Sequence, residues 1–244
     1  MLAVIGGTGF AEFSELDDIE ELHLDTAYGA SHILKGVLAD RTILFLPRHG
    51  IPPSTPPHRI NYRANIQALK EAGASVIVAV NAVGSVDPSL EVPHLVIPDR
   101  IIDYTWGREH TFYDDEIHHI DFTHPYDPAL RASLIQAAAS LREVDDSMPY
   151  RDSGVYGCTQ GPRLETAAEI QRLAADGCHV VGMTGMPEAA LARERNIPYA
   201  SLSIVVNTGA GIKGPEVDLA GIEPAILKGM GWVREIVRYL AACM

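Results

Sequence analysis

Cysteine, aromatic residues and basic charge are all scarce in this chain of 244 residues. The three cysteines, Cys158, Cys178 and Cys243, form neither a metal-ligand spacing nor a disulfide framework, so we expect small core residues in a reducing compartment. Lysine and arginine total 19 against 32 aspartate and glutamate residues, which gives a formal net charge of -13. This balance disfavours a surface that coats nucleic acid, and we expect no nucleic-acid partner.

Long hydrophobic runs are also missing. No apolar stretch approaches the roughly 18 residues that indicate a transmembrane helix. The opening sequence MLAVIGG lacks the basic region, apolar core and cleavage site of a secretory signal. We therefore expect no membrane partner and a cytoplasmic location.

Short β-branched runs and helical patterns alternate along the chain. The runs are mostly continuous, which is typical of strands covered on both faces, and they lie at 2–7, 41–50, 75–84, 94–103, 154–161, 179–185 and 200–209. Helical patterns are predicted at 61–73, 128–143, 163–177, 186–196 and 223–244. This order predicts a single α/β domain over residues 1–244, with a central mixed, largely parallel sheet flanked by helices.

Polar or glycine-rich loops follow most of the predicted strands. In open α/β sheets, ligands bind beyond the carboxyl ends of the strands. Here those ends carry GGTG, RHG, NAVGS, TQGPRLET, MTGMPE and NTGAG. Together they predict one composite site at a single edge of the sheet.

Three of these ends suit an anion. Glycines beside Thr8 let backbone N–H groups approach closely, Arg48 and His49 can donate from side chains, and Thr184 precedes a helix N-terminus. Structural alternatives remain open for each: GGTG could be a plain turn, Arg48 could be a solvated surface residue, and Thr184 could lie near the helix cap. No Gly-Lys-Ser/Thr follows GGTG, and Glu12 stands where a dinucleotide fingerprint needs glycine or alanine, which disfavours a nicotinamide-dependent dehydrogenase. We expect one small dianion such as free phosphate.

Two acids, Glu165 and Glu188, begin predicted helices. The helix dipole favours acids there, so a structural role stays open for both, while Glu165 could instead accept hydrogen bonds from the edge of a heterocycle. Several histidines gather in the irregular segment 103–126, yet their spacing matches no metal motif, and we predict no metal site.

The motifs IGGTG, PRHG, NYRANIQALKEAGA, VNAVGS, CTQGPRLET and GMTGMPEAALARER resemble the trimeric purine nucleoside phosphorylase and methylthioadenosine phosphorylase family, in order and over essentially the whole chain. The resemblance implies phosphorolysis, in which inorganic phosphate attacks the anomeric carbon of a purine nucleoside. Phosphate is then a co-substrate, and neither a metal nor an organic cofactor takes part. The resemblance also implies a homotrimer.

The resemblance carries roles onto individual positions. It assigns phosphate binding to Thr8, Arg48, His49, Asn81, Ala82 and Thr184. Met183 would line the ribose, and the catalytic pair Glu165 and Asn207 would hold the base beside Thr208 and Gly209. A neighbouring subunit would help to close the site, and His119 is the candidate for that contribution.

The base site resembles the 6-oxopurine branch of the family. The adenosine branch carries an aspartate at the position of Asn207 and a second acid at that of Gly209. A 6-oxopurine offers N1–H to the carboxylate of Glu165, and its N7 and O6 can accept from the amide of Asn207. A simple strand-end cap remains the alternative role for Asn207.

The sugar site differs from the inosine and guanosine enzymes of the family, which use a histidine against the 5′-hydroxyl. No histidine occurs from Asn207 to Met244, and Leu219 and Ile222 stand near the matching place. We expect an apolar wall that accepts a 5′-methylthio group, a combination similar to the branch that acts on S-methyl-5′-thioinosine. Ordinary helix packing of Leu219 and Ile222, a general 6-oxopurine nucleoside phosphorylase and a non-catalytic nucleoside-binding protein stay open.

Overall fold

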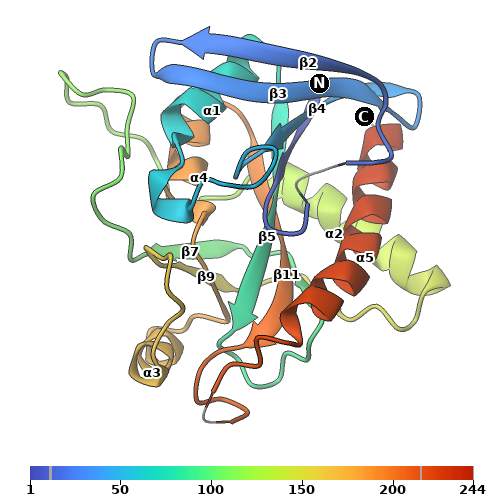
Figure 1. Cartoon of the computed structure of the whole chain (residues 1–244), viewed down its shortest axis with the longest axis vertical. Coiled ribbons are helices and arrows are strands. Elements are labelled where there is room, and N and C mark those ends of the chain that lie inside the picture. The colour runs from blue at the N-terminus through green and yellow to red at the C-terminus, as the bar shows by residue number, and fades with distance from the viewer. Residues whose placement is uncertain (11–12, 215, 244) are drawn as a thin grey trace.

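Several apolar runs form strands in the computed structural model of the chain, which describes residues 1–10, 13–214 and 216–243 (Figure 1). The strands are β1 (Leu2–Gly6), β2 (Asp17–Thr26), β3 (Gly29–Leu38), β4 (Arg41–Pro47), β5 (Val76–Ser85), β6 (His94–Val96), β7 (Arg100–Asp103), β8 (Tyr150–Arg151), β9 (Val155–Cys158), β10 (Val180–Gly182) and β11 (Tyr199–Thr208). The helices are α1 (Tyr62–Glu71), α2 (Pro128–Val144), α3 (Ala167–Ala175), α4 (Gly185–Glu194) and α5 (Ile222–Cys243), and Pro57–Arg59 forms a 3-10 turn.

Within the described residues, all eleven strands belong to one mixed sheet. Its main path is β2-β3-β4-β1-β5-β10-β9-β7, while β11 pairs with β5 and β6, and β8 pairs with β6. The long strand β5 is the centre, because it pairs in parallel with β1 on one side and β11 on the other. The antiparallel pairs are β2 with β3, β3 with β4, β5 with β10, and β6 with β11. The predicted mixed, largely parallel sheet is therefore confirmed.

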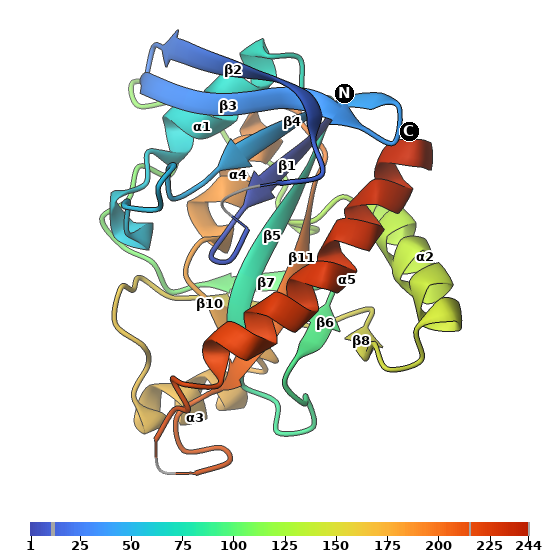
Figure 2. The same cartoon turned by 45° about the vertical axis from the view of Figure 1, so that its right-hand side comes forward.

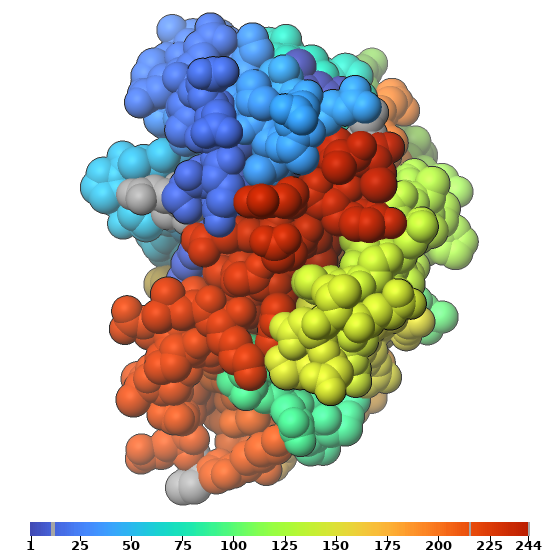
Figure 3. All heavy atoms as spheres, turned by 90° about the vertical axis from the view of Figure 1, so that its right-hand side faces the viewer, coloured from blue at the N-terminus to red at the C-terminus, as the bar shows by residue number. Residues whose placement is uncertain are grey.

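Two hydrophobic cores lie on opposite faces of the sheet. Along β5, Val78 and Val80 enter one core, and the alternating Ile77 and Ala79 enter the other. Helices α2 and α5 supply residues to the first core, and α1 and α4 to the second. Figure 2 shows α5 crossing the sheet beside β11, and Figure 3 shows it lying between the N-terminal strands and α2. Burial on both faces explains why these strands read as continuous apolar runs.

The predicted helices and strands are present, with two differences. Strands β2, β3 and β8 were not predicted; the residues of β2 are mostly exposed, half of them are charged, and β8 has only two residues. The run at 94–103 splits into β6 and β7 around Pro98, which cannot donate to a sheet.

Cys158 and Cys178 are buried free thiols as expected, whereas Cys243 is exposed. Glu12 and Met244, which entered the sequence analysis, lie outside the described residues.

Across the described residues, none of the helices has the length and apolar character that a membrane span requires.

Two glycines in α5 allow a test of how this helix packs. A Cβ at Gly229 would lie 2.5 Å from Cγ2 of Ile204 on β11, whereas a Cβ at the exposed Gly231 would meet no atom within 4 Å. We expect Gly229→Ala to lower the free energy of unfolding by about 1–3 kcal/mol through overpacking. Gly231→Ala, the matched control, should raise it by up to about 1 kcal/mol, because alanine favours the helix. Urea unfolding measures both, and equal effects would contradict the packing.

Candidate active site

A cavity lies where the predicted composite site was expected, at the carboxyl ends of β1, β4, β5, β10 and β11. Most of the residues singled out in the sequence line it: Thr8, Arg48, His49, Asn81, Ala82, Glu165, Met183, Thr184, Asn207, Gly209 and Ile222. Segments far apart in the chain are thus brought to one place by the strand order. The structure places these residues in one cavity, and their roles in binding stay predictions.

A buried ion pair forms the base of this cavity. The Nε and Nη2 atoms of Arg48 donate to the two carboxylate oxygens of Glu188, at 2.8 and 2.9 Å, and both side chains are 1% exposed. The hydroxyl of Tyr199 donates to the same carboxylate at 2.8 Å. The pair joins the end of β4 to the start of α4. Glu188 is therefore the partner of Arg48, whereas the sequence analysis could describe it only as an acid at the start of a helix.

The charge of Arg48 is fixed by this arrangement. Burial disfavours a charged guanidinium, but the adjacent carboxylate of Glu188 outweighs it and raises the pKa of Arg48 above its ordinary value. Nη1 also donates to the carbonyl of Val80 at 3.1 Å. Of the five N–H groups of the guanidinium, three donate to the residues that the structure describes, so one hydrogen on each of Nη1 and Nη2 could donate to an anion.

The imidazole of His49 lines the same cavity as Arg48. Its Nδ1 lies 2.8 Å from the carbonyl of Thr55, which can only accept, so Nδ1 carries a hydrogen. Burial lowers the pKa of His49, and the nearby positive charge of Arg48 lowers it further. The lowered pKa favours the neutral ring, and Nε2 makes no hydrogen bond to the residues that the structure describes.

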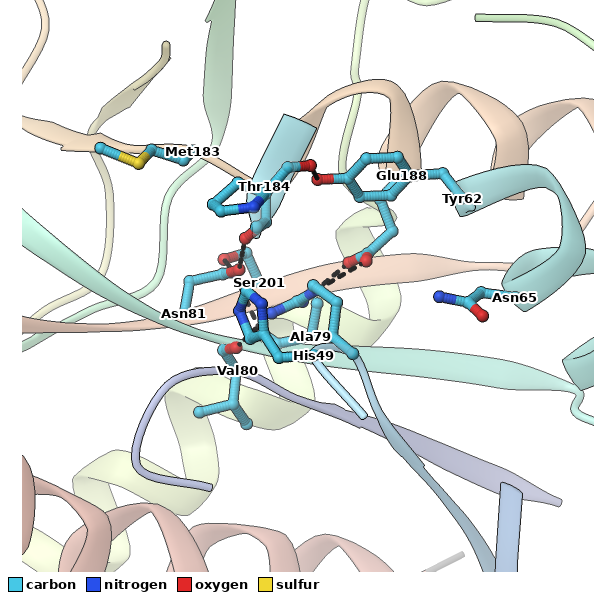
Figure 4. Close-up of polar contacts among 12 residues, drawn as sticks. His49, Tyr62, Asn65, Ala79, Val80, Asn81, Met183, Thr184, Glu188 and Ser201 are labelled. Carbon is cyan, nitrogen blue, oxygen red and sulfur yellow. Dashed lines mark hydrogen bonds and ion pairs between the residues drawn. The ribbon is translucent and has the colours of Figure 1, made fainter. Parts of the chain in front are cut away.

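A chain of buried polar groups supports the opposite side of the site (Figure 4). The hydroxyl of Thr184 donates to Oδ1 of Asn81 at 2.9 Å, and Nδ2 of Asn81 donates to the hydroxyl of Ser201 at 2.8 Å. Ser201 continues to Ser203 at 3.1 Å. The second hydrogen on Nδ2 of Asn81 faces the carbonyl of Ala79 at 3.4 Å, so both amide hydrogens are used and Asn81 fixes the position of Thr184.

Gly7 owes its place in the loop GGTG to close packing. A Cβ at this position would lie 2.7 Å from the carbonyl oxygen of Val80 and 2.9 Å from Nη1 of Arg48. Both contacts are too short for any side chain. Glycine here therefore lets the loop with Thr8 approach the Arg48 guanidinium.

The carboxylate of Glu165 is held by one neighbour. Thr159 donates its hydroxyl to Oε1 at 2.6 Å, and the half-buried carboxylate lines the cavity. The second oxygen has no protein donor among the described hydrogen bonds. Glu165 can therefore accept a hydrogen bond from a donor on a bound molecule.

A β-bulge directs Asn207 into the cavity. The pairing of β11 with β5 shifts between Val205 and Asn207, so that Val206 is an extra residue in the ladder. Asn207 then lies opposite Gly84, where an added Cβ would come within 3.2 Å of its Nδ2. One amide hydrogen donates to the carbonyl of Thr208 at 3.0 Å, which leaves Oδ1 and one N–H for a ligand.

The apolar part of the cavity differs from the predicted wall. Ile222 lines the cavity as expected, together with Val217 and Ile226. The prediction for Leu219 was wrong in placement, because its side chain is 66% exposed and does not line this cavity. Leu219 precedes the first turn of α5 and faces outward, and Ile226, one turn beyond Ile222, takes the place expected of it.

Two further predicted residues lie outside the cavity lining. Thr208 borders a separate surface pocket with Asp218, on the far side of Asn207. His119 is exposed in the segment between β7 and α2 and does not line the cavity of its own chain. Its suggested contribution to a neighbouring subunit is untested.

Arg108 is a buried residue that the sequence analysis missed. Its Nη1 donates to the carbonyls of Met183 and Met186, and its Nη2 donates to the carbonyl of Gln160 at 2.9 Å. These bonds fasten the loop that carries Glu165 to the loop that carries Thr184. No motif marked this arginine, because its partners are backbone oxygens that the sequence does not reveal.

Comparisons of the sequence with known proteins agree on one family. The model of the phosphorylase superfamily matches residues 1–231. A probable S-methyl-5′-thioinosine phosphorylase from Pseudomonas syringae pv. tomato is 50% identical over 98% of both chains. A 6-oxopurine nucleoside phosphorylase from Pyrococcus furiosus is 46% identical over 88% of this chain and 82% of that protein.

Solved structures give the same result for the fold. A methylthioadenosine phosphorylase from Schistosoma mansoni, in complex with adenine, superposes with a TM-score of 0.91 and 31% sequence identity. The match covers 99% of this chain and 90% of that one. The single-domain α/β fold predicted from the sequence is the fold of these structures.

The ion pair under the cavity generates a stability prediction. Glu188→Ala leaves the Arg48 guanidinium buried without a counter-charge, and we expect a loss of about 3–5 kcal/mol in the free energy of unfolding. Glu20→Ala, which removes the partner of Lys35 in an exposed pair, should cost no more than about 1 kcal/mol. Urea unfolding at neutral pH compares them, and a loss below about 1 kcal/mol for Glu188→Ala would show that the pair is not structurally required.

Proposed function

The chain belongs to the phosphorylase superfamily, and we propose that it cleaves S-methyl-5′-thioinosine with inorganic phosphate. The products would be hypoxanthine and S-methyl-5-thio-α-D-ribose 1-phosphate. One observation carries the proposal: a single cavity combines the uncharged amide of Asn207 and the carboxylate of Glu165 with an apolar wall formed by Val217, Ile222 and Ile226.

The phosphate would lie against Arg48. The two unused guanidinium hydrogens suit two phosphate oxygens, and the loop of Thr8 and the ring of His49 border the same cavity. Thr184, held by Asn81, supplies a hydroxyl at a fixed position. In this scheme Asn81 acts through Thr184, and Ala82 lines the site beside it.

The proposed reaction is a displacement at the anomeric carbon. A phosphate oxygen forms a bond to C1′ as the bond from C1′ to N9 of the purine breaks, and the bonding electrons leave with the base. The sugar carries positive charge in the transition state, and the phosphate dianion beside it stabilises that charge. Arg48, itself held by Glu188, holds the phosphate in place, and the scheme uses no metal or organic cofactor.

The leaving purine carries the opposite charge. The free N–H of Asn207 can donate to N7 or O6, where negative charge develops, and Glu165 can accept from N1–H. Adenine has no hydrogen at N1, so its N1 lone pair would face the carboxylate of Glu165. A hydrogen-bonding mismatch of this kind in a buried site discriminates by about 10⁴-fold or more in strong cases.

The apolar wall would contact the 5′ substituent of the sugar. Val217, Ile222 and Ile226 offer no hydrogen bond to a hydroxyl, and burial of a methylthio group against them is favourable. A general 6-oxopurine nucleoside phosphorylase is the second candidate, and the identity with the Pyrococcus furiosus enzyme favours it. The two candidates share the base site and differ only at this wall.

We also propose a homotrimer in the cytoplasm, with His119 of one subunit near the cavity of the next. The segment that carries His119 exposes large apolar side chains, with Trp106 70% and Ile117 88% exposed, which suits an interface between subunits. The free thiols of Cys158, Cys178 and Cys243 suit a reducing compartment.

Phosphate-dependent base release from three nucleosides tests the proposed function directly. We expect the order S-methyl-5′-thioinosine, then inosine, then methylthioadenosine, measured as kcat/KM under identical conditions. Equal or faster turnover of inosine would favour the general 6-oxopurine enzyme. Faster turnover of methylthioadenosine would contradict the roles of Asn207 and Glu165.

Asn207→Asp tests the base site alone. A protonated aspartate can donate to N7 of adenine, so we expect kcat/KM to rise for methylthioadenosine and to fall for S-methyl-5′-thioinosine. Thr208→Ser, next to it but outside the cavity lining, is the control and should leave the ratio of the two substrates unchanged. If Asn207→Asp loses activity on S-methyl-5′-thioinosine without any gain on methylthioadenosine, residues other than Asn207 determine which base is accepted.

Ile222→Ala tests the apolar wall. Loss of buried contact should lower the preference for S-methyl-5′-thioinosine over inosine by about tenfold or more, as expected for a hydrophobic pocket. Leu219→Ala is the matched control, because this exposed side chain lies outside the cavity and should leave the preference as it is. If Leu219→Ala lowered the preference and Ile222→Ala did not, Leu219 would have the role that the sequence analysis predicted for it.

A further inference from the structure

Three potential metal ligands meet on the outer face of the β2–β3 hairpin. His23 on β2 lies directly opposite His32 on β3, and Glu21 is two residues before His23 on the same strand. Because side chains alternate along a strand, all three project from one face. None of them lines the candidate active site.

The distances within this group suit a shared metal ion. Nε2 of His23 and Nε2 of His32 lie 3.5 and 3.3 Å from the same oxygen, Oε2 of Glu21. All three candidate ligand atoms lie within 4.8 Å of one another. Ligand atoms bound to one tetrahedral zinc ion at about 2.1 Å are about 3.4 Å apart, so the two N–O distances already have that size.

We propose that Glu21, His23 and His32 form a surface site for a divalent transition-metal ion such as Zn²⁺. Two imidazoles and one carboxylate are donors that zinc, copper and nickel ions accept, whereas Mg²⁺ and Ca²⁺ prefer oxygen ligands. Three protein ligands leave a fourth position of a tetrahedral ion for water. The net charge of -13 also favours cations at the surface.

A second observation points to a ligand at His32. Its Nε2 is shielded from solvent and has no hydrogen-bond partner, although the ring faces Glu21. A buried imidazole nitrogen without a partner is unfavourable, and a metal ion would satisfy it. Among residues 1–10, 13–214 and 216–243, this is the one group of three such side chains that meets the distance requirement.

Binding requires a small rotation of one ring. The two imidazoles are stacked, with centroids 4.5 Å apart and planes within 6°, so their lone pairs lie in parallel planes and cannot both point at one ion. His23 is 73% exposed and Glu21 is 63% exposed, so both can turn toward the ion without disturbing the core. The less exposed His32 would remain as the fixed ligand.

The ion would link two neighbouring strands at the edge of the sheet. β2 is the end strand of the main path, and its only strand partner in the described pairings is β3. An ion held by Glu21 and His23 from β2 and by His32 from β3 would cross-link this pair. We therefore expect metal binding to raise thermal stability and to leave turnover unchanged.

The test is calorimetric titration of the untagged chain with ZnCl₂, in the Cys243→Ser background because an exposed thiol binds the same ion. We expect about one Zn²⁺ per chain, bound at least about tenfold more weakly by His32→Ala and by His23→Gln. His124→Ala removes an exposed histidine outside the group and is the matched control, with binding unchanged. MgCl₂ should give no saturable binding.

A thermal unfolding series gives a second readout. Zn²⁺ should raise the melting temperature of the parent and of His124→Ala, but not that of His32→Ala. Binding that is unchanged in both His23→Gln and His32→Ala, or no saturable binding in the parent, would overturn the proposal. Because His23 is mostly exposed, His23→Gln is expected to fold normally, so loss of binding in that variant cannot be attributed to unfolding.

Discussion

The buried pair of Arg48 and Glu188 is the interaction on which the candidate site depends. It joins the end of β4 to the start of α4, and the hydroxyl of Tyr199 ties it to β11. A buried guanidinium needs a counter-charge, and one carboxylate provides it through two hydrogen bonds. The pair therefore fixes the end of β4, the start of α4 and the start of β11 relative to one another, and it keeps the Arg48 guanidinium charged beside the cavity. The remaining guanidinium hydrogens are available for an anion because the others are already satisfied.

Much of the fold and of the cavity could be predicted from the sequence, because continuous apolar runs mark strands that are buried on both faces. The polar loops after those runs were expected to lie at one edge of the sheet, and Thr8, Arg48 and Asn207 do line one cavity. The hairpin β2–β3 escaped prediction because its outer strand is exposed and charged and lacks an apolar run. Glu188 looked like a helix-start acid, since its partner lies 140 residues away in the chain.

The other contacts that the sequence analysis did not predict depend on long-range pairing or on the direction in which side chains point at the start of a helix. His23 and His32 come together only through the register of an antiparallel pair, which no motif spacing shows. Leu219 and Ile222 are three residues apart, and the start of α5 decides which of them faces the cavity. Arg108 binds backbone carbonyls, and such partners have no signature in side-chain sequence. In each case the missing information was a tertiary contact rather than a local preference.

The extra residue at Val206 has a consequence for how this scaffold can diverge. Before the bulge, β11 keeps a strict register with β5 and fills both cores; after it, the register is displaced by one and Asn207 faces the cavity. One inserted residue therefore separates the part of β11 that packs in both cores from the part that lines the cavity. Substitutions beyond the bulge can change the cavity lining while the packed part of the strand keeps its contacts. The sheet can thus stay the same while the residues that line the cavity change.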